Sequence, residues 1–113
     1  MQLGYRFGLV VRFELLEGHA EAFDALTAET LASVRANEPG TLVYLAHSEL
    51  DEPDVRVFYE LYEDQAAFEV HETSPHVQRF LDQRINHLRG DPAVWRVRPH
   101  DGVVRPGADP DGV

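Results

Sequence analysis

The chain has 113 residues, room for one hydrophobic core, and a formal net charge of −10 that disfavours nucleic-acid binding, because phosphates require clustered Lys and Arg. It contains no apolar run of the roughly 20 residues that a membrane span needs, and its first residues lack the pattern of a secretory signal. The absence of cysteine excludes disulfides, a thiol nucleophile and a thiolate metal site, and we expect a cytoplasmic protein.

The first half of the chain predicts a strand, a helix and a second strand. Residues 5–16 alternate large apolar side chains with a mixed set, which is the two-residue period of a strand. Residues 20–36 have apolar side chains at helical spacing, and residues 37–40 carry helix stop signals. A second strand is predicted over residues 41–48.

The second half of the chain predicts a third strand, two helical segments and a fourth strand. A polar turn around Pro53 leads into a strand over residues 55–62. Helical segments follow over residues 64–72 and 75–88, where apolar side chains recur at helical spacing. The fourth strand is predicted over residues 93–98.

The C-terminal residues are rich in Gly, Pro and Asp and show no hydrophobic periodicity. Such a segment cannot bury enough apolar area to offset the entropy lost on ordering. We therefore expect a folded domain over residues 1–99 and a flexible tail over residues 100–113.

The third predicted strand has large apolar side chains on both of its faces. Phe58 and Tyr62 lie on the same face as the carboxylate of Glu60, and the other face carries Val, Leu and Tyr59. A strand with one solvated face would not place large rings on it, so both faces are predicted to be covered. Glu60 then needs a hydrogen-bonding partner or a position near water in a cleft.

Two histidines lie where the two predicted helical segments meet. Ser74 is a favourable N-cap residue and Pro75 suits the first helical position, which places His76 in the first turn. The positive end of the helix dipole disfavours an imidazolium there, so we expect a neutral His76 that can accept a proton. His71 lies just before the junction. The alternative interpretation is a histidine that only caps or packs at a helix start.

The order and spacing of these residues resemble the antibiotic biosynthesis monooxygenase family from about residue 5 to residue 98. The matching positions are an aromatic strand with Glu60, Tyr62-Glu63-Asp64, Ala67, His71, Ser74-Pro75-His76, Phe80 and, upstream, the segment from Glu38-Pro39-Gly40 to Tyr44. The resemblance implies a dimeric α+β barrel with a cavity in each subunit. Relatives include cofactor-free oxygenases, haem-degrading enzymes and members proposed to act as isomerases.

The predicted βαββαβ order is itself typical of an α+β, ferredoxin-like fold. In that fold a four-stranded antiparallel sheet carries both helical segments on one face. The other face of the predicted sheet still shows apolar side chains from several strands. A second copy packed against that face is the simplest way to cover it, so we expect a homodimer.

The resemblance implies a cofactor-independent monooxygenase that uses molecular oxygen to oxidise a quinol, an anthrone or a similar electron-rich aromatic small molecule. Such a substrate reduces oxygen itself once it is deprotonated, so the protein needs a base, a dry aromatic cavity and donors for the developing oxyanion. His76 or His71 is the predicted base, and Glu60 is predicted to orient the imidazole. The predicted pocket residues are Tyr44, Phe58, Tyr62, Phe80 and Trp95.

Two other functions stay open, a non-catalytic binding or dimerisation module and an isomerase, because one fold hosts many functions. No cofactor is expected. Haem-degrading relatives bind iron through a histidine where this chain has Leu81, and they carry a tryptophan where it has His71. His71, His76 and Glu60 do not share one helix face, so we expect no metal site. His47, on the second strand, is expected to face solvent.

Overall fold

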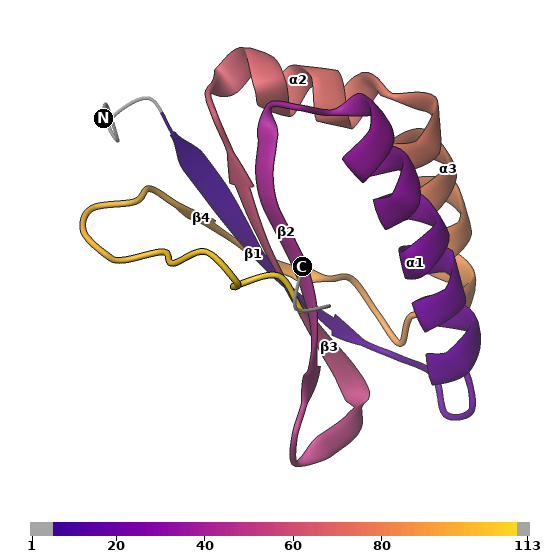
Figure 1. The fold of residues 1–113 in the computed structure, drawn as a ribbon. Coiled ribbons are helices and arrows are strands. Elements are labelled where there is room, and N and C mark those ends of the chain that lie inside the picture. Colours follow the sequence, from indigo (N-terminus) through magenta and orange to yellow (C-terminus); the bar gives the residue numbers. More distant parts are fainter. Residues whose placement is uncertain (1–5, 111–113) are drawn as a thin grey trace.

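The structure is a computed structural model that describes residues 6–110. These residues form one sheet with all helices on one of its faces (Figure 1). The elements are β1 (Phe7–Glu14), α1 (Ala20–Asn37), β2 (Thr41–Glu49), β3 (Glu52–Tyr62), α2 (Gln65–Thr73), α3 (Pro75–Arg84), the 3-10 turn η2 (Ile85–His87) and β4 (Ala93–Val97). All strand pairs are antiparallel, and the strands lie in the order β2-β3-β1-β4. The predicted ferredoxin-like βαββαβ fold is confirmed.

Three elements end earlier than the sequence predicts, and β4 does so by a single residue, at Val97. The last helix is predicted through residue 88, but α3 ends at Arg84 and η2 follows. Leu88 is extended because it pairs with Leu15 in an isolated antiparallel bridge. Leu15, the other residue of this bridge, directly follows β1, which ends at Glu14. Tyr5, the predicted first residue of that strand, lies outside the described residues.

The core is built around four phenylalanines, one from each of β1, α1, β3 and α3: Phe13, Phe23, Phe58 and Phe80. All four side chains are buried. The ring centroids of Phe13 and Phe58 lie 4.7 Å apart, and those of Phe13 and Phe23 lie 5.2 Å apart. Burial of each ring contributes roughly 1.5–3 kcal/mol. The cluster therefore fixes α1 and α3 on the sheet and leaves the space beside α2 to be filled by other groups.

Two glycines permit close approaches at the end of the sheet near α2. A Cβ at Gly40 would lie 2.6 Å from the Cβ of Ala67, so a larger residue would push α2 away from the start of β2. A Cβ at Gly8 would lie 2.4 Å from the carbonyl oxygen of Glu60 on the neighbouring strand. Both positions therefore require glycine because backbone or helix packs directly against them.

The face of the sheet that the helices leave uncovered is largely apolar. Cross-strand pairing places its side chains together, for example Val10 opposite Tyr59 and Trp95, and Leu45 opposite Tyr59. The apolar members of this open face are Val10, Val43, Leu45, Val57, Tyr59, Leu61, Trp95 and Val97. Trp95 is 51% exposed in the single chain. An apolar sheet face of this kind favours packing against a second copy.

Residues 101–110, which follow β4, form no helix or strand and are exposed. Two hydrogen bonds in this segment are local, from the Ala108 amide to the Arg105 carbonyl at 3.3 Å and from the Gly102 amide to the Asp101 side chain at 2.8 Å. The division into a domain over residues 1–99 and a tail over residues 100–113 stays a prediction. Within residues 6–110, no helix combines the length and apolar character needed to cross a membrane.

We expect the chain to form a homodimer through the open face. Light scattering at micromolar concentration should give twice the chain mass. Tyr59→Glu places a charge at the centre of this face, where burial without a partner is costly, and it should yield a folded monomer. Tyr59→Phe, which keeps the apolar ring, is the matched control and should stay dimeric. A monomeric wild-type chain, or a Tyr59→Glu variant that remains fully dimeric, would contradict packing through this face.

Candidate active site

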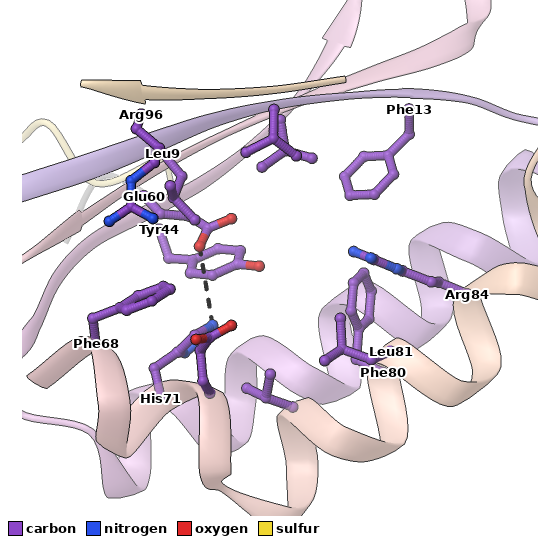
Figure 2. Close-up of a pocket in the computed structure, with 14 residues that line it drawn as sticks. Leu9, Phe13, Tyr44, Glu60, Phe68, His71, Phe80, Leu81, Arg84 and Arg96 are labelled. Atoms are coloured by element: carbon purple, nitrogen blue, oxygen red, sulfur yellow. Dashed lines mark ion pairs between the residues drawn. The ribbon is translucent and has the colours of Figure 1, made fainter. Parts of the chain in front are cut away.

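A cavity of about 310 Å³ lies between the sheet and helices α2 and α3 (Figure 2). Its walls come from all four strands and from both helices. They are formed by Leu9, Val11, Phe13, Tyr44, Glu60, Phe68, His71, Glu72, Val77, Phe80, Leu81, Arg84, Val94 and Arg96. Most of these side chains are apolar, and a few polar groups converge among them. That combination, and a volume close to the lower end for small-molecule sites, suits a compact aromatic ligand.

His71 is the histidine in the cavity wall. It lies in the last turn of α2, is buried, and packs against Tyr44 and Tyr62 in tilted contacts with centroid distances of 5.5 and 5.1 Å. Its Nδ1 lies 2.7 Å from Oε1 of Glu38, and its Nε2 lies 4.0 Å from Oε1 of Glu60. Burial lowers the pKa of His71, although the nearby Glu38 acts in the opposite direction. A neutral imidazole is therefore the stable form at neutral pH.

Glu38 is the residue at the centre of this arrangement. It follows α1 directly, and its side chain is 1% exposed. Its carboxylate accepts hydrogen bonds from Thr41 Oγ1 at 2.7 Å, from His71 Nδ1 and from His76 Nε2. Burial alone would raise the pKa of Glu38, but the hydrogen bonds from His76, Thr41 and His71 outweigh it and hold the pKa below its usual range.

An ionised Glu38 fixes the tautomer of His71. A carboxylate only accepts hydrogen bonds, so Nδ1 of His71 must carry the proton of the bond that joins them. Because the imidazole is neutral, Nε2 then keeps a free lone pair. That nitrogen is on the side of the ring that faces Glu60 and the cavity (Figure 2). The geometry therefore presents a base to the cavity.

His76 contacts Glu38 and does not line the cavity. It is in the first turn of α3, as the sequence predicts, and Pro75 occupies the N-terminal turn. Its Nε2 hydrogen-bonds to Glu38 and lies 3.1 Å from Ser74 Oγ. Ser74 is at the N-cap position, but its hydroxyl donates to the His71 carbonyl at 2.7 Å instead of capping α3. His76 is not among the residues that line the cavity.

Glu60 finds its partner on its own strand. Tyr62 Oη donates to Oε1 of Glu60, and both residues are buried. Burial raises the pKa of Glu60 to about 7, although hydrogen bonds from Tyr62 and Tyr44 act in the opposite direction. Burial and the adjacent Glu60 raise the pKa of both tyrosines well above the usual range, so both keep their protons. Near neutral pH, Glu60 is therefore present in both its neutral and its ionised form.

The predicted pocket residues divide between the cavity wall and its surroundings. Tyr44 and Phe80 line the cavity. Phe58 and Tyr62 are buried beside it, in the core and against the His71 ring. Trp95 points to the open face, because Leu9 pairs with the next residue of β4 and strand side chains alternate. Its neighbours in sequence, Val94 and Arg96, line the cavity instead.

Three further predictions concern the surroundings of the site. His47 is exposed, and its Nδ1 lies 2.9 Å from the Val57 carbonyl oxygen. Within residues 6–110 no group of three or more His, Asp or Glu side chains is arranged to hold a metal ion. Glu60 is predicted to orient an imidazole, but Glu38 is the carboxylate that hydrogen-bonds to both histidines.

Glu38 was identifiable only as part of the family pattern. One physical signal exists in the sequence: a carboxylate directly after a helix is opposed by the negative end of the helix dipole. Its position there indicates that other groups compensate it. The sequence does not say which groups, because the donors come from a strand and two helices that meet only in the fold.

A model of the antibiotic biosynthesis monooxygenase family matches residues 6–83. The chain belongs to this family. The matched range begins at the start of the sheet and includes Glu38, Glu60, His71 and His76. No curated protein matches the chain.

Solved structures of similar proteins share the family fold. A candidate antibiotic biosynthesis monooxygenase from Caulobacter crescentus is 24% identical with a TM-score of 0.81, over 86% of this chain and 92% of that chain. A Mycobacterium tuberculosis protein is 24% identical with a TM-score of 0.80, over 88% and 99%. A Shewanella oneidensis protein is 26% identical with a TM-score of 0.76, over 84% and 91%.

We expect Glu60 to make the protein less stable as pH rises. Its pKa is about 7 in the folded chain and usually 4.5, so the folded state holds the proton more tightly. The stability that this proton contributes is fully present below about pH 4.5 and is lost as the pH rises to about 7. Glu60→Gln removes this effect and should be more stable than wild type at pH 8, by roughly 3 kcal/mol at most. Urea unfolding from pH 5 to pH 8 measures the difference.

The exposed Glu69→Gln on α2 is the matched control for this measurement. It removes one carboxylate without touching the cavity, and its stability should run parallel to wild type over the same pH range. A Glu60→Gln variant that also runs parallel to wild type would show that Glu60 is fully ionised in the fold.

Proposed function

We propose that the protein is a cofactor-independent monooxygenase that oxidises a quinol, an anthrone or a related electron-rich aromatic with molecular oxygen. The observation that supports this most is a single arrangement: the Nε2 lone pair of buried His71 faces a largely apolar cavity while Glu38 holds Nδ1. Family membership supports oxygenase chemistry in general, and the cavity volume suits a small aromatic substrate.

In this proposal His71 takes the proton that activates the substrate. A phenol or an acidic ring methylene placed at the cavity face of His71 transfers its proton to Nε2. The imidazolium that forms is stabilised by the ionised Glu38 at 2.7 Å, which also prevents the ring from rotating. Tyr44 and a protonated Glu60 supply hydrogen-bond donors on the facing wall for the substrate oxygen.

The oxygen chemistry then belongs to the substrate anion. For an anthrone, the carbanion transfers an electron to O₂, and the resulting radical pair combines to a peroxide anion. His71 returns its proton to that peroxide, which loses water and leaves a new carbonyl. One atom of O₂ enters the product, and the other leaves as water with both methylene hydrogens. The apolar walls keep bulk water away from the anion during these steps.

His76 has a different role in the proposal from the one the sequence favours. The sequence favours His76 as the base, but its Nε2 hydrogen-bonds to Glu38 and the residue is not part of the cavity wall. A group in that position does not reach a substrate in the cavity. We therefore propose His71 as the base, with Glu38 and His76 as positioning residues that hold it.

Oxygen uptake separates this function from the alternatives. An isomerase or a binding module can use the same cavity, but neither consumes oxygen. With 1,8-dihydroxyanthrone as the probe, and with the uncatalysed oxidation subtracted, the wild-type protein should consume one O₂ per anthraquinone formed. A folded protein that binds this probe without accelerating uptake, and that also fails with hydroquinones, contradicts the oxygenase proposal.

His71→Ala should stay folded and lose turnover by roughly a hundredfold to ten-thousandfold, the usual cost of removing a general base. The reason is that no other imidazole lines the cavity among the described residues. His100→Ala, which removes an exposed histidine that follows β4, is the matched control and should keep wild-type turnover. Full activity in the His71→Ala variant would show that another group is the base.

Glu38→Gln should lower kcat more than it raises KM, because an amide no longer holds the Nδ1–H tautomer or stabilises the imidazolium. His76→Ala should lower kcat by a smaller factor, since Glu38 keeps its bonds from Thr41 and His71. The kcat against pH profile should shift in Glu38→Gln, whereas a loss of folding alone would lower kcat equally at every pH. A larger loss in His76→Ala than in His71→Ala contradicts the assigned roles.

A further inference from the structure

Arg84 is a cation in the cavity wall, and among residues 6–110 no carboxylate lies within ion-pair distance of it. It extends from the last turn of α3 into the cavity, with its guanidinium directed toward the Tyr44 side of the wall (Figure 2). Its direct contact is with the Phe13 ring, 5.7 Å from the centroid. Burial lowers the pKa of Arg84, against the attraction of Tyr44 and Glu60, but an arginine remains charged.

Two other arginines that are at least partly buried, Arg56 and Arg12, have carboxylate partners. Arg56 binds Asp24 through two nitrogens at 2.9 and 3.0 Å. Arg12 contacts Glu14 at 3.1 Å and Glu52 at 3.5 Å. In a chain with 20 acidic and 10 basic residues, a partner for a cation is easily supplied. A cation left without one in a cavity is costly unless a ligand provides the opposite charge.

The acidic groups nearest the cavity do not neutralise Arg84. Oε1 of Glu60 accepts a hydrogen bond from Tyr62, and the Glu60 carboxyl group is neutral for much of the time near pH 7. Glu72 reaches the cavity from α2 but is exposed, and within residues 6–110 neither carboxylate forms an ion pair with Arg84. Glu38 is buried behind His71 and already accepts three hydrogen bonds.

We propose that the cavity takes an aromatic substrate that carries a carboxylate, and that Arg84 binds this group at the end of the cavity away from His71. A guanidinium offers a planar pair of donors that matches a carboxylate in two parallel hydrogen bonds. The inference rests on the proposed function for the reacting phenol at His71. His71 and Arg84 lie on opposite sides of the cavity (Figure 2). The substrate carboxylate is therefore placed on the edge of the substrate ring that is remote from the reacting phenol.

Binding of two matched probes tests this inference without requiring turnover. The probes are 4,5-dihydroxyanthraquinone-2-carboxylate and its 2-hydroxymethyl analogue, which share the ring system and differ in the charged group. Calorimetry at low ionic strength should show that wild type binds the carboxylate at least tenfold more tightly. Arg84→Gln should bind both probes equally, and Arg84→Lys should retain part of the preference because it keeps the charge without the planar donors.

Two arginine variants serve as controls for charge and location. Arg79→Gln removes an exposed arginine of α3 that pairs with Glu29, so it should keep the full preference. Arg96→Gln removes the cation on β4, whose guanidinium lies over the Phe7 ring, and it should keep most of the preference. A wild-type protein without the preference, or one whose preference is lost in Arg96→Gln and kept in Arg84→Gln, overturns the inference.

His71→Ala separates this inference from the oxygenase proposal. It should keep the carboxylate preference in binding while losing oxygen uptake. If wild type shows the preference but never consumes oxygen, the oxygenase proposal fails and the anion site stands. If wild type consumes oxygen but binds both probes equally, the anion site fails and the oxygenase stands.

Thermal melting gives a second readout that distinguishes ligand binding from a structural role. A ligand-binding cation without a counter-ion destabilises the free protein, so Arg84→Met should melt at the same temperature as wild type or higher. The carboxylate probe should raise the melting temperature of wild type and not that of Arg84→Met. A variant that melts well below wild type would assign Arg84 to packing against Phe13 and overturn the inference.

Discussion

The site depends on one buried carboxylate. Glu38 lies at the end of α1, where the helix dipole opposes its charge, and it is almost completely removed from water. It remains ionised because donors from β2, α2 and α3 converge on its two oxygens. The same three bonds join the elements around the cavity and fix the tautomer of His71. Stability of this end of the fold and orientation of the base therefore have one physical origin.

The rest of the cavity follows from burial of polar groups among apolar walls. Tyr44 and Tyr62 stay protonated, and Glu60 gains a proton near neutrality because its charge is poorly solvated. The cavity wall thus holds the neutral base of His71 near Tyr44 and Glu60, with the Arg84 cation on the opposite side. Such a division suits an aromatic molecule that gives up a proton at one end and carries charge at the other.

Hydrophobic periodicity predicted the fold well because a half-buried strand and an amphipathic helix leave distinct periods in sequence. It also placed Glu60 on an inner face with Phe58. It could not determine which side chains of β4 face the cavity, because five residues on an exposed edge strand allow either register. In the structure, Trp95 points away from the cavity. Nor could hydrophobic periodicity choose between His71 and His76. That choice depends on how two helices cross after Ser74 and on Glu38, which is distant in sequence and reaches both rings only in the fold.

The central claim is that Glu38 holds His71 in the Nδ1–H form with a free Nε2 toward the cavity. Imidazole ¹⁵N chemical shifts, measured by long-range ¹H–¹⁵N correlation on the uniformly labelled protein at neutral pH, report this directly. We expect a protonated Nδ1 and an unprotonated Nε2 for His71, assigned by the loss of these signals in a His71 variant, and a return toward mixed tautomers in Glu38→Gln. A His71 signal with protonated Nε2 and free Nδ1, or an imidazolium at pH 7, would contradict it.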